Sequence, residues 1–327
     1  MPGSAGVVLA GGRSSRMGTP KAALEWHGST LLRRTVGILA RATGGPVVVV
    51  RAKGQELPEL PKYVEVIDDP QEGKGPVQGI AAGLAALVVR ADVAFVSSTD
   101  MPFLHPAFVR RVLRAVHEGA DVGLPVARGY PQPLAAAYRT KLAVTAERLV
   151  QAERLRPAFL FEQCAVSRLD EAALKDDPVL AALDPRLTSV VNVNEPDDYR
   201  TARDEPAPEI TIQRFGVLAA QHHRAPETVR AATVAEAAAA AGVDFGGGHV
   251  TAALNGDQIT RDGQTPLAAG DTVFFLSADA GGLRPCRLAA TSAGPSSSTS
   301  APGPRRRSSC PTTCSARTSA APGSEPG

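Results

Sequence analysis

Short apolar runs alternate with longer segments of helical periodicity through the first 200 residues. Four of the runs read as β-strands: 6–9, 46–51, 64–67 and 93–97. Three of the longer segments read as helices: 30–41, 76–90 and 106–117. Alternation of this kind favours βαβ units and a mostly parallel sheet covered by helices on both faces. We therefore predict a three-layer, Rossmann-like α/β domain over residues 1–203.

The same pattern continues beyond residue 120. The runs "DVGLPV" and "PLAAAY" predict two further strands, and residues 142–152 predict another helix. The stretch "SVVNVNEPDDY" predicts a strand that leads into a turn. A helix is expected to begin at Pro196, because proline is favoured at the first helical position and acidic residues follow it.

A different pattern begins after the proline-rich, charged stretch "RDEPAPE", within which residues 204–209 are the predicted linker. The run "EITIQRFGVLAA" predicts a strand, and "TVAEAAAAAG" predicts a helix that ends at Gly242. The runs "HVTAALNG" and "DTVFFLS" predict strands. The order is roughly β-β-α-β-β, so residues 210–282 are a predicted small α+β domain.

The final segment, residues 283–327, differs from both. It contains six arginines, one acidic residue and no aromatic residue, and Ser, Pro, Ala, Thr and Gly dominate the rest. Such a segment cannot bury enough apolar surface to offset the entropy of ordering, so we expect disorder. Its composition also resembles a GC-rich reading frame translated out of phase. The run 305–307 is interpreted as a solvated group of charges.

Composition narrows the class of protein. The formal net charge is +2 and hydrophobic residues make up 43% of the chain, while aromatic residues make up 4%. We therefore expect a core of Val, Leu, Ala and Ile and no nucleic-acid partner. Neither a signal peptide nor a membrane span is expected, and four cysteines provide no disulfide framework. A cytoplasmic protein is the expectation.

The stretch "LAGGRSSRMGTPK", Leu9–Lys21, places glycines and cations directly after the first predicted strand. Glycines permit positive φ angles, and successive backbone amides can form a nest that binds anions. The spacing is neither the Walker A pattern nor G-x-G-x-x-G. From the residues alone, either a phosphate-binding loop or an ordinary glycine-rich loop remains possible.

The pattern L-A-G-G-x-S-x-R-M-G-x-x-K resembles the signature loop of molybdopterin guanylyltransferases, the MobA-like nucleotidyltransferases. Three downstream stretches agree in order: "VIDDPQEGKGPVQGIAAGL", "STDMPF" and "NVNEPDDY". The resemblance extends from Gly6 to about Arg203. The residues on the loop pattern are Leu9, Ala10, Gly11, Gly12, Ser14, Arg16, Met17, Gly18 and Lys21.

This resemblance implies roles for particular residues. Lys21, Arg16 and the amides of Gly11 and Gly12 would hold the triphosphate, and Leu9 and Ala10 belong to the same nucleotide-binding loop. Asp69 and Gly79 would lie near the base and ribose.

Asp100 would bind Mg²⁺ at the end of a buried strand, although an Asx turn is the alternative for this residue. Asn192 and Asn194 would supply a second oxygen ligand or cap a helix. Lys21, Arg16 and Asp100 form the predicted catalytic set.

The implied reaction transfers GMP from GTP to molybdopterin. Gly12 matches guanylyl-transferring members, whereas Arg51 stands where these usually carry asparagine, so transfer of CMP or another NMP to a different phosphorylated acceptor is the alternative. Gln132 and Pro133 match the segment on the acceptor side. Arg154 and Arg156 would meet a pterin phosphate or form a solvated helix face.

The small domain resembles β-grasp sulfur carriers, especially the small subunit of molybdopterin synthase. The matching positions are Leu254, Asn255, Gly256, Leu267, Gly270, Asp271, the run 273–276 and the glycines 281 and 282. The resemblance implies the synthase large subunit or an adenylating enzyme as partner.

In such carriers the diglycine ends the chain, whereas here Leu283 follows it. Cleavage after Gly282, a docking role and a non-biological tail are the alternatives. Another class of function, a carrier or docking protein on a non-catalytic scaffold, also stays open. His222 and His223 are interpreted as a surface pair.

Overall fold

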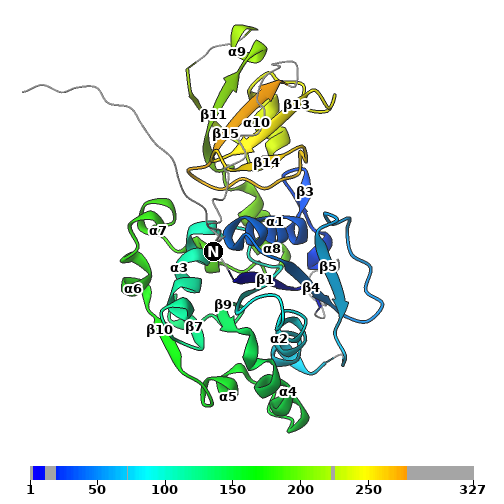
Figure 1. Cartoon of the computed structure of the whole chain (residues 1–327), viewed down its shortest axis with the longest axis vertical. Coiled ribbons are helices and arrows are strands. Elements are labelled where there is room, and N and C mark those ends of the chain that lie inside the picture. The colour runs from blue at the N-terminus through cyan, green and yellow to red at the C-terminus, as the bar shows by residue number, and fades with distance from the viewer. Residues whose placement is uncertain (1–2, 12–19, 72, 222–224, 278–327) are drawn as a thin grey trace, which may run out of the picture. The chain divides into compact units, whose positions relative to one another are not determined.

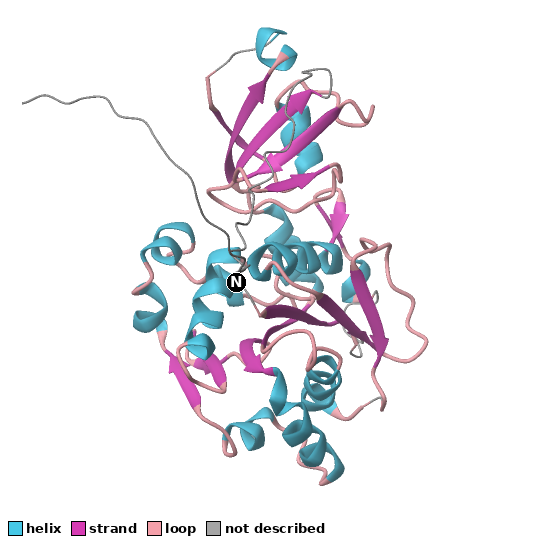
Figure 2. Ribbon diagram, viewed as in Figure 1, coloured by secondary structure: helices cyan, strands magenta, loops and turns pink. Residues whose placement is uncertain are grey.

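A mixed eight-stranded sheet organises the first two thirds of the chain (Figures 1 and 2). This computed structural model describes residues 3–11, 20–71, 73–221 and 225–277. The strand order is β10-β7-β9-β6-β1-β4-β5, with β8 paired to β7. The strands are β1 Ser4–Leu9, β4 Val47–Arg51, β5 Val64–Asp68, β6 Val93–Ser98, β7 Val122–Ala127, β8 Tyr130–Pro131, β9 Ala135–Arg139 and β10 Val166–Leu169.

The pairing is mostly parallel, as the sequence predicted. Strand β1 pairs in parallel with both β4 and β6, with Val8 opposite Val49 and Ser97. The pairs β4·β5 and β10·β7 are also parallel, whereas β9 runs antiparallel to β6 and β7. The carboxyl ends of β1, β4, β5 and β6 therefore lie at one edge of the sheet, where open α/β sheets bind ligands.

Helices cover both faces of this sheet (Figure 1). The residues Val8, Val49 and Phe95 form a core with α1 and α3 on one face, and Val7, Val48 and Val96 form a core with α2 and α4 on the other. The alternation follows from strand geometry, in which successive side chains point to opposite faces. The longer helices are α1 Leu31–Thr43, α2 Gly75–Ala85, α3 Pro106–His117, α4 Ala143–Gln151 and α8 Pro196–Asp204.

Local signals account for the ends of these helices. Thr30 caps α1, because its hydroxyl accepts a hydrogen bond from the backbone N–H of Arg33, and Gly44 ends the helix with φ 68°. Helix α8 begins at Pro196 with a reciprocal capping box between Glu195 and Asp198. The predicted start at Pro196 is confirmed.

Several elements differ from the sequence predictions or were not predicted. The strand expected in "SVVNVN" is wrong: a 3₁₀ helix spans Thr188–Val190, and residues 191–194 belong to no strand. The strand expected to continue to residue 220 ends at Phe215, and a short helix follows. Elements not predicted include β2 Glu25–Trp26, β3 Ser29–Thr30, β8, β10, α5 Pro157–Phe161, α6 Glu171–Lys175, α7 Pro178–Leu183, the strand Gln258–Thr260 and the 3₁₀ helices Lys21–Ala23 and Thr140–Leu142.

Residues 209–277 carry a separate five-stranded sheet, in the order β12-β11-β15-β13-β14. Strands β11 and β15 are parallel at its centre, and the remaining pairs are antiparallel. Helix α10 covers it through Val234, Ala237 and Ala238. The elements are β11 Glu209–Phe215, α9 Val217–Gln221, β12 Glu227–Arg230, α10 Val234–Ala240, β13 Val250–Leu254, β14 Gln258–Thr260 and β15 Thr272–Ser277. We call this part the small domain.

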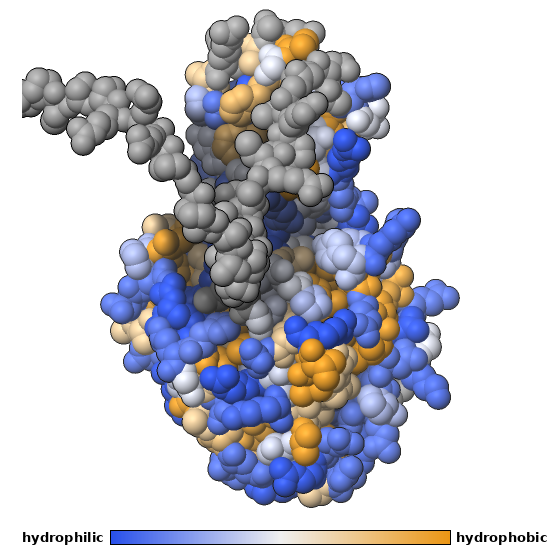
Figure 3. Space-filling view, viewed as in Figure 1, coloured by the Kyte–Doolittle hydropathy of each residue, from blue (hydrophilic) through white to orange (hydrophobic). Residues whose placement is uncertain are grey.

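Two predictions fall outside the described residues. These are the histidine pair 222–223, together with the segment from residue 278 to the end that holds the two glycines and the tail. In the part of the chain that is described, no helix is long and apolar enough to cross a membrane. On the face shown in Figure 3, hydrophilic side chains surround smaller apolar areas.

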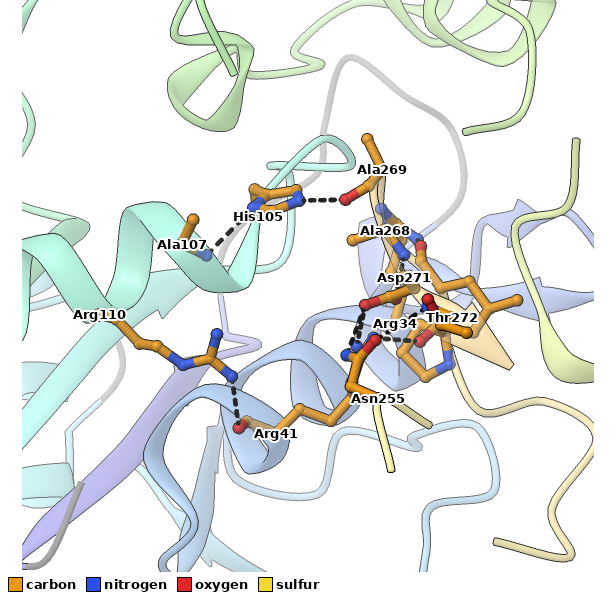
Figure 4. A network of polar contacts seen from close by, with 12 residues as sticks. Arg34, Arg41, His105, Ala107, Arg110, Asn255, Ala268, Ala269, Asp271 and Thr272 are labelled. Atoms are coloured by element: carbon orange, nitrogen blue, oxygen red, sulfur yellow. Dashed lines mark hydrogen bonds and ion pairs between the residues drawn. The ribbon is translucent and has the colours of Figure 1, made fainter. Parts of the chain in front are cut away.

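The small domain meets the large sheet domain through residues 265–271, which we call the docking segment (Figure 4). Arg41 of α1 donates hydrogen bonds to the carbonyl of Pro266 at 2.7 Å and to the Asp271 carboxylate at 2.6 Å. Pro266 packs so closely on α1 that a Cβ at Gly37 would lie 2.5 Å from it. The side chain of Ala268 belongs to the core of the large domain, and that of Leu267 to the core of the small one.

The Arg41–Asp271 pair is nearly excluded from water, with 4% and 8% of the two side chains exposed. Burial alone would raise the pKa of Asp271, but the charge of Arg41 and hydrogen bonds from Arg41, Asn255 and the N–H of Ala268 outweigh it, and the net pKa is lowered. A carboxyl group whose pKa is lowered by folding stabilises the fold above its unfolded pKa, and this contribution is lost as the pH falls through the folded value.

We expect Asp271→Asn to lower the free energy of unfolding at pH 7 by about 3 kcal/mol, because Arg41 keeps a buried charge without a counter-charge. The difference from the native chain should shrink as the pH falls below 3.8, the ordinary pKa of the group, and approach zero once Asp271 is protonated. Urea unfolding at several pH values measures both effects.

The matched control is Asp262→Asn. This change removes an ion pair with Arg33 in which the Asp262 side chain is 38% exposed. This change should cost less than about 1 kcal/mol. Equal losses in the two variants, or a difference that does not depend on pH, would contradict the role assigned to Asp271.

Candidate functional site

A cavity of about 480 Å³ lies where the carboxyl ends of β1, β4 and β6 meet. Leu9, Ala10 and Gly11 line it at the end of β1, and Ser98, Thr99 and Asp100 line it at the end of β6. Parallel pairing brings these residues together, since adjacent parallel strands finish at the same edge. The cavity therefore lies where the fold is expected to bind a ligand.

Four polar side chains converge at its rim. The ammonium Nζ of Lys21 donates to Asp100 Oδ2 and to Asn194 Oδ1, both at 2.9 Å. The hydroxyl of Ser98 donates to the other carboxylate oxygen of Asp100. The group combines segments 79 and 173 residues apart in the sequence, namely the 3₁₀ helix at Lys21, the end of β6 and the entry to α8.

The backbone fixes this arrangement. The N–H of Val193 donates to the carbonyl of Asp100 at 2.9 Å, which ties the segment before α8 to the turn after β6. The Asp198 carboxylate accepts from the N–H groups of Asn194 and Glu195 at 3.1 and 3.0 Å. The side chains of Lys21 and Asp100 are 19% and 15% exposed, so their ion pair is shielded from water yet open to a ligand.

Asp69 and Gly79 line the same cavity from other elements. Asp69 follows β5, its N–H donates to the carbonyl of Arg51 at 2.7 Å, and its carboxylate accepts from the N–H of Gln71. Gly79 lies in α2, where a Cβ would be 3.1 Å from Leu9. Both predicted nucleotide-binding residues therefore lie with Leu9, Ala10, Gly11, Lys21 and Asp100 around one space.

Gln55 supports the site and was not predicted from the sequence. Its side-chain amide donates to the carbonyl of Ala10 at 3.0 Å and accepts from the N–H of Ala52 at 3.0 Å. Ala10 and Ala52 both line the cavity, so Gln55 joins the chain after β1 to the chain after β4. A single glutamine in a loop has no sequence signal that would have identified it.

Arg51 is held away from the cavity lining. Its guanidinium donates to Asp68 at 2.7 Å and to the carbonyl of Gln55 at 3.1 Å. One partner ends β5 and the other lies in the loop after β4, so Arg51 joins the end of β4 to both.

The structure separates the two predicted asparagines. Asn194 reaches Lys21, whereas Asn192 lines a second cavity of about 510 Å³ that also contacts Trp26, Phe103 and His105. The carboxamide of Gln132 donates to the carbonyls of Ala127 and Tyr130. Of the four residues predicted for the acceptor side, Gln132, Pro133, Arg154 and Arg156, none lines the first cavity as the structure describes it.

Arg154 has partners of its own on the surface. Its guanidinium pairs with Glu162 at 2.9 Å and lies 4.1 Å from the ring centre of Phe159. Arg154 lies in the loop between α4, which ends at Gln151, and α5, which begins at Pro157, so the alternative of a solvated helix face is wrong in its secondary structure.

The remaining predicted residues of the glycine-rich loop, Gly12, Ser14, Arg16, Met17 and Gly18, lie outside the described residues. Within the ranges that are described, no three or more His, Cys, Asp or Glu side chains are grouped so that they could hold a metal ion. Any cation at Asp100 would thus take few ligands from protein carboxylates.

A mostly parallel α/β sheet with charged and polar side chains around a cavity at its carboxyl edge belongs to the class of open α/β folds that bind ligands there. Comparison with known proteins gives the family. The MobA-like NTP transferase domain matches residues 6–167. The chain belongs to this family and is a nucleotidyltransferase.

Similar proteins from bacteria agree with this assignment. A probable molybdenum cofactor guanylyltransferase of Mycobacterium tuberculosis strain H37Rv is 41% identical over 169 residues, which are 50% of this chain and 82% of that protein. A protein of the same name from Bacillus cereus strain Q1 is 30% identical over 203 residues, which are 62% of this chain and 96% of the relative.

Among solved structures, molybdopterin-guanine dinucleotide biosynthesis protein A from Archaeoglobus fulgidus has a TM-score of 0.47 at 25% identity. The match covers 61% of this chain and 97% of that one.

We expect Lys21→Met to weaken the binding of a nucleoside triphosphate, tested with GTP, about 10- to 100-fold. The change removes a charge-assisted hydrogen bond of about 1.5–3 kcal/mol from the side chain that faces the cavity. Equilibrium dialysis measures the dissociation constant, and a thermal melt verifies folding.

Lys175→Met is the matched control, since Lys175 pairs with Glu171 on the surface of α6 and does not line the cavity. This variant should bind GTP as the native chain does. Unchanged binding by Lys21→Met would remove Lys21 from the nucleotide site.

Proposed function

We propose that this chain transfers GMP from GTP to molybdopterin in a Mg²⁺-dependent reaction of molybdenum cofactor biosynthesis. The observation that supports it most is the convergence of Lys21, Asp100 and Asn194 at the cavity, in a chain that is 41% identical over 169 residues to a probable molybdenum cofactor guanylyltransferase. All described residues that the sequence analysis assigned to nucleotide binding line this one cavity: Leu9, Ala10, Gly11, Lys21, Asp69, Gly79 and Asp100.

Phosphate binding follows from the chemistry of the rim. The chain after β1 approaches β4 closely at Gly11, where a Cβ would be 3.1 Å from the backbone nitrogen of Ala52. A larger residue would therefore crowd this strand edge. Lys21 supplies a positive charge beside it, and an ammonium with three donors can pass from Asp100 and Asn194 to phosphate oxygens.

The residues around Asp100 fit a hard cation. A carboxylate, the Ser98 hydroxyl and the Asn194 carboxamide are oxygen groups of the kind that Mg²⁺ prefers, and Mg²⁺ commonly binds through one or two carboxylates plus substrate phosphates. The nitrogen of Lys21 lies between two of these oxygens, so the site already favours positive charge. Bound there, a divalent cation would neutralise charge on the phosphates.

The proposed chemistry is a displacement at the α-phosphorus of GTP. A terminal phosphate oxygen of molybdopterin forms a bond to that phosphorus, the bond to the bridging oxygen of the β-phosphate breaks, and pyrophosphate leaves. Positioning and charge stabilisation are sufficient for such transfers, without a covalent enzyme intermediate. Lys21 would stabilise the departing phosphates, and Asp69 and Gly79 would contact the ribose and base.

Two alternatives have different substrates or roles. Transfer of CMP or another nucleotide uses the same cavity, and Arg51 leaves the base contact open because its guanidinium is bound to Asp68. A docking or sulfur-carrier protein with a non-catalytic scaffold would need neither Lys21 nor Asp100. Their direct ion pair at the cavity favours the enzyme.

We also propose a β-grasp fold for the small domain. The support is a sheet whose first and last described strands, β11 and β15, are parallel neighbours, with hairpins outside them and a helix across one face. Sulfur transfer by this domain would need a free carboxylate on Gly282, which is followed by Leu283. We therefore assign the small domain a docking role in the intact chain. The synthase large subunit or an adenylating enzyme is the proposed partner if cleavage frees Gly282.

Pyrophosphate release with molybdopterin and each of GTP, CTP, ATP and UTP tests the proposal. We expect GTP to be preferred, and Asp100→Asn to lower turnover by at least about 100-fold, because removing one electrostatic contact to developing charge has costs of this size. Asp257→Asn, at an exposed turn of the small domain, is the matched control and should retain full activity.

A preference for CTP would support the first alternative. Native turnover by Asp100→Asn would reject the assigned mechanism and favour a non-catalytic scaffold.

A further inference from the structure

We propose that the small domain positions the catalytic turn, so that Arg34 and His105 transmit its docking to Asp100. This inference rests on the proposed function, since it concerns the residue assigned to metal and phosphate. The turn in question, residues 100–105, connects the end of β6 to the start of α3.

Arg34 is the first connection (Figure 4). Its Nε donates to the carbonyl of Pro102, two residues after Asp100, and one Nη donates to the carbonyl of Leu267 in the docking segment at 3.1 Å. One rigid guanidinium therefore spans the catalytic turn and the small domain. Burial, reinforced by the nearby charge of Arg41, lowers the pKa of Arg34 to about 10, so the group remains charged at neutral pH.

His105 is the second connection. Its Nδ1 accepts from the N–H of Ala107 at 3.1 Å and caps α3, which leaves the proton on Nε2 to be donated to the carbonyl of Ala269 at 3.0 Å. The backbone N–H of His105 donates to the Ser189 hydroxyl. The far end of the turn is thus attached to the docking segment as well.

Both side chains are only 8% exposed, so water competes little for their hydrogen bonds. The acceptors, the carbonyls of Leu267 and Ala269, belong to the small domain alone. The family match covers residues 6–167, so residues 265–271 lie outside it. The bonds to the carbonyls of Leu267 and Ala269 therefore come from outside the matched domain.

Two other ion pairs attach the small domain to α1 without contacting the catalytic turn, so they distinguish positioning of the turn from attachment of the domain. Arg33, next to Arg34 on α1, pairs with Asp262 of the small domain at 2.7 Å. The hydrogen bonds of the Arg33 guanidinium go to Asp262 and to the carbonyl of Glu59, so Asp262→Asn removes one attachment of the small domain without changing a bond to the turn at 100–105. Arg41 and Asp271 likewise attach the domain through α1 rather than through the turn.

The test uses the full chain and three variants. Arg34→Lys keeps the charge but has one nitrogen in place of the fork that reaches both carbonyls. His105→Asn keeps a side-chain acceptor that can cap α3 and loses the Nε2–H bond to Ala269. Asp262→Asn is the control, and melting temperatures verify that all three fold.

We expect Arg34→Lys and His105→Asn each to lower kcat for pyrophosphate release about tenfold or more, with a much smaller change in the KM for GTP. Small displacements of a catalytic group have rate effects of this order. Hydrogen exchange of the backbone amides of Met101 and of residues 103–105 should be faster in both variants than in the native chain. Asp262→Asn should change neither quantity.

Unchanged kcat and unchanged exchange in both variants would overturn the inference, as would an equal loss in Asp262→Asn. If the native chain releases no pyrophosphate with any nucleotide, the proposed function fails instead. Exchange at 101–105 then still decides whether the small domain orders this turn.

Discussion

The ion pair between Lys21 and Asp100 is the interaction on which the site depends. It joins the segment after β1 to the end of β6, and through Asn194 it also holds the entry to α8. Three distant parts of the sequence therefore meet at one partly shielded position. A positive group between oxygen atoms, at the carboxyl edge of a parallel sheet, suits a site that exchanges one set of negative partners for another.

Two parts of the structure support this pair. The first is the apolar core of strands β1, β4 and β6, in which Val7, Val48 and Val96 are fully buried. The second is the turn at residues 100–105, which Arg34 and His105 hold. The strands belong to the nucleotidyltransferase domain, whereas Arg34 and His105 also bond to the small-domain carbonyls of Leu267 and Ala269.

Much of the fold could be predicted because its core strands are short, apolar and β-branched, and because Thr30, Pro106 and Pro196 mark helix starts. The segment from 153 to 187 could not, since its helices are only five or six residues long and show no sustained periodicity. The run 189–194 is rich in β-branched valine like a strand but forms single backbone hydrogen bonds, including Val193 to Asp100, so composition alone was misleading.

The cavity residues Gly11, Lys21, Asp69, Gly79 and Asp100 could be found because a family resemblance ordered them. Asn192 and Asn194 share a motif, yet a motif does not fix the direction of side chains in an irregular segment, and only Asn194 meets Lys21. Gln55, Arg34 and His105 were missed, because each acts on backbone carbonyls or amides that no sequence pattern reveals.

A crystal structure of the full chain with Mn²⁺ and a GTP analogue that cannot transfer its nucleotide tests the central claim most directly. The account predicts an anomalous peak about 2.1 Å from an Asp100 oxygen, the distance typical of Mg²⁺, with Lys21 turned to the triphosphate beside Gly11. A metal bound elsewhere, with the Lys21–Asp100 pair unchanged and the cavity free of nucleotide, would contradict it.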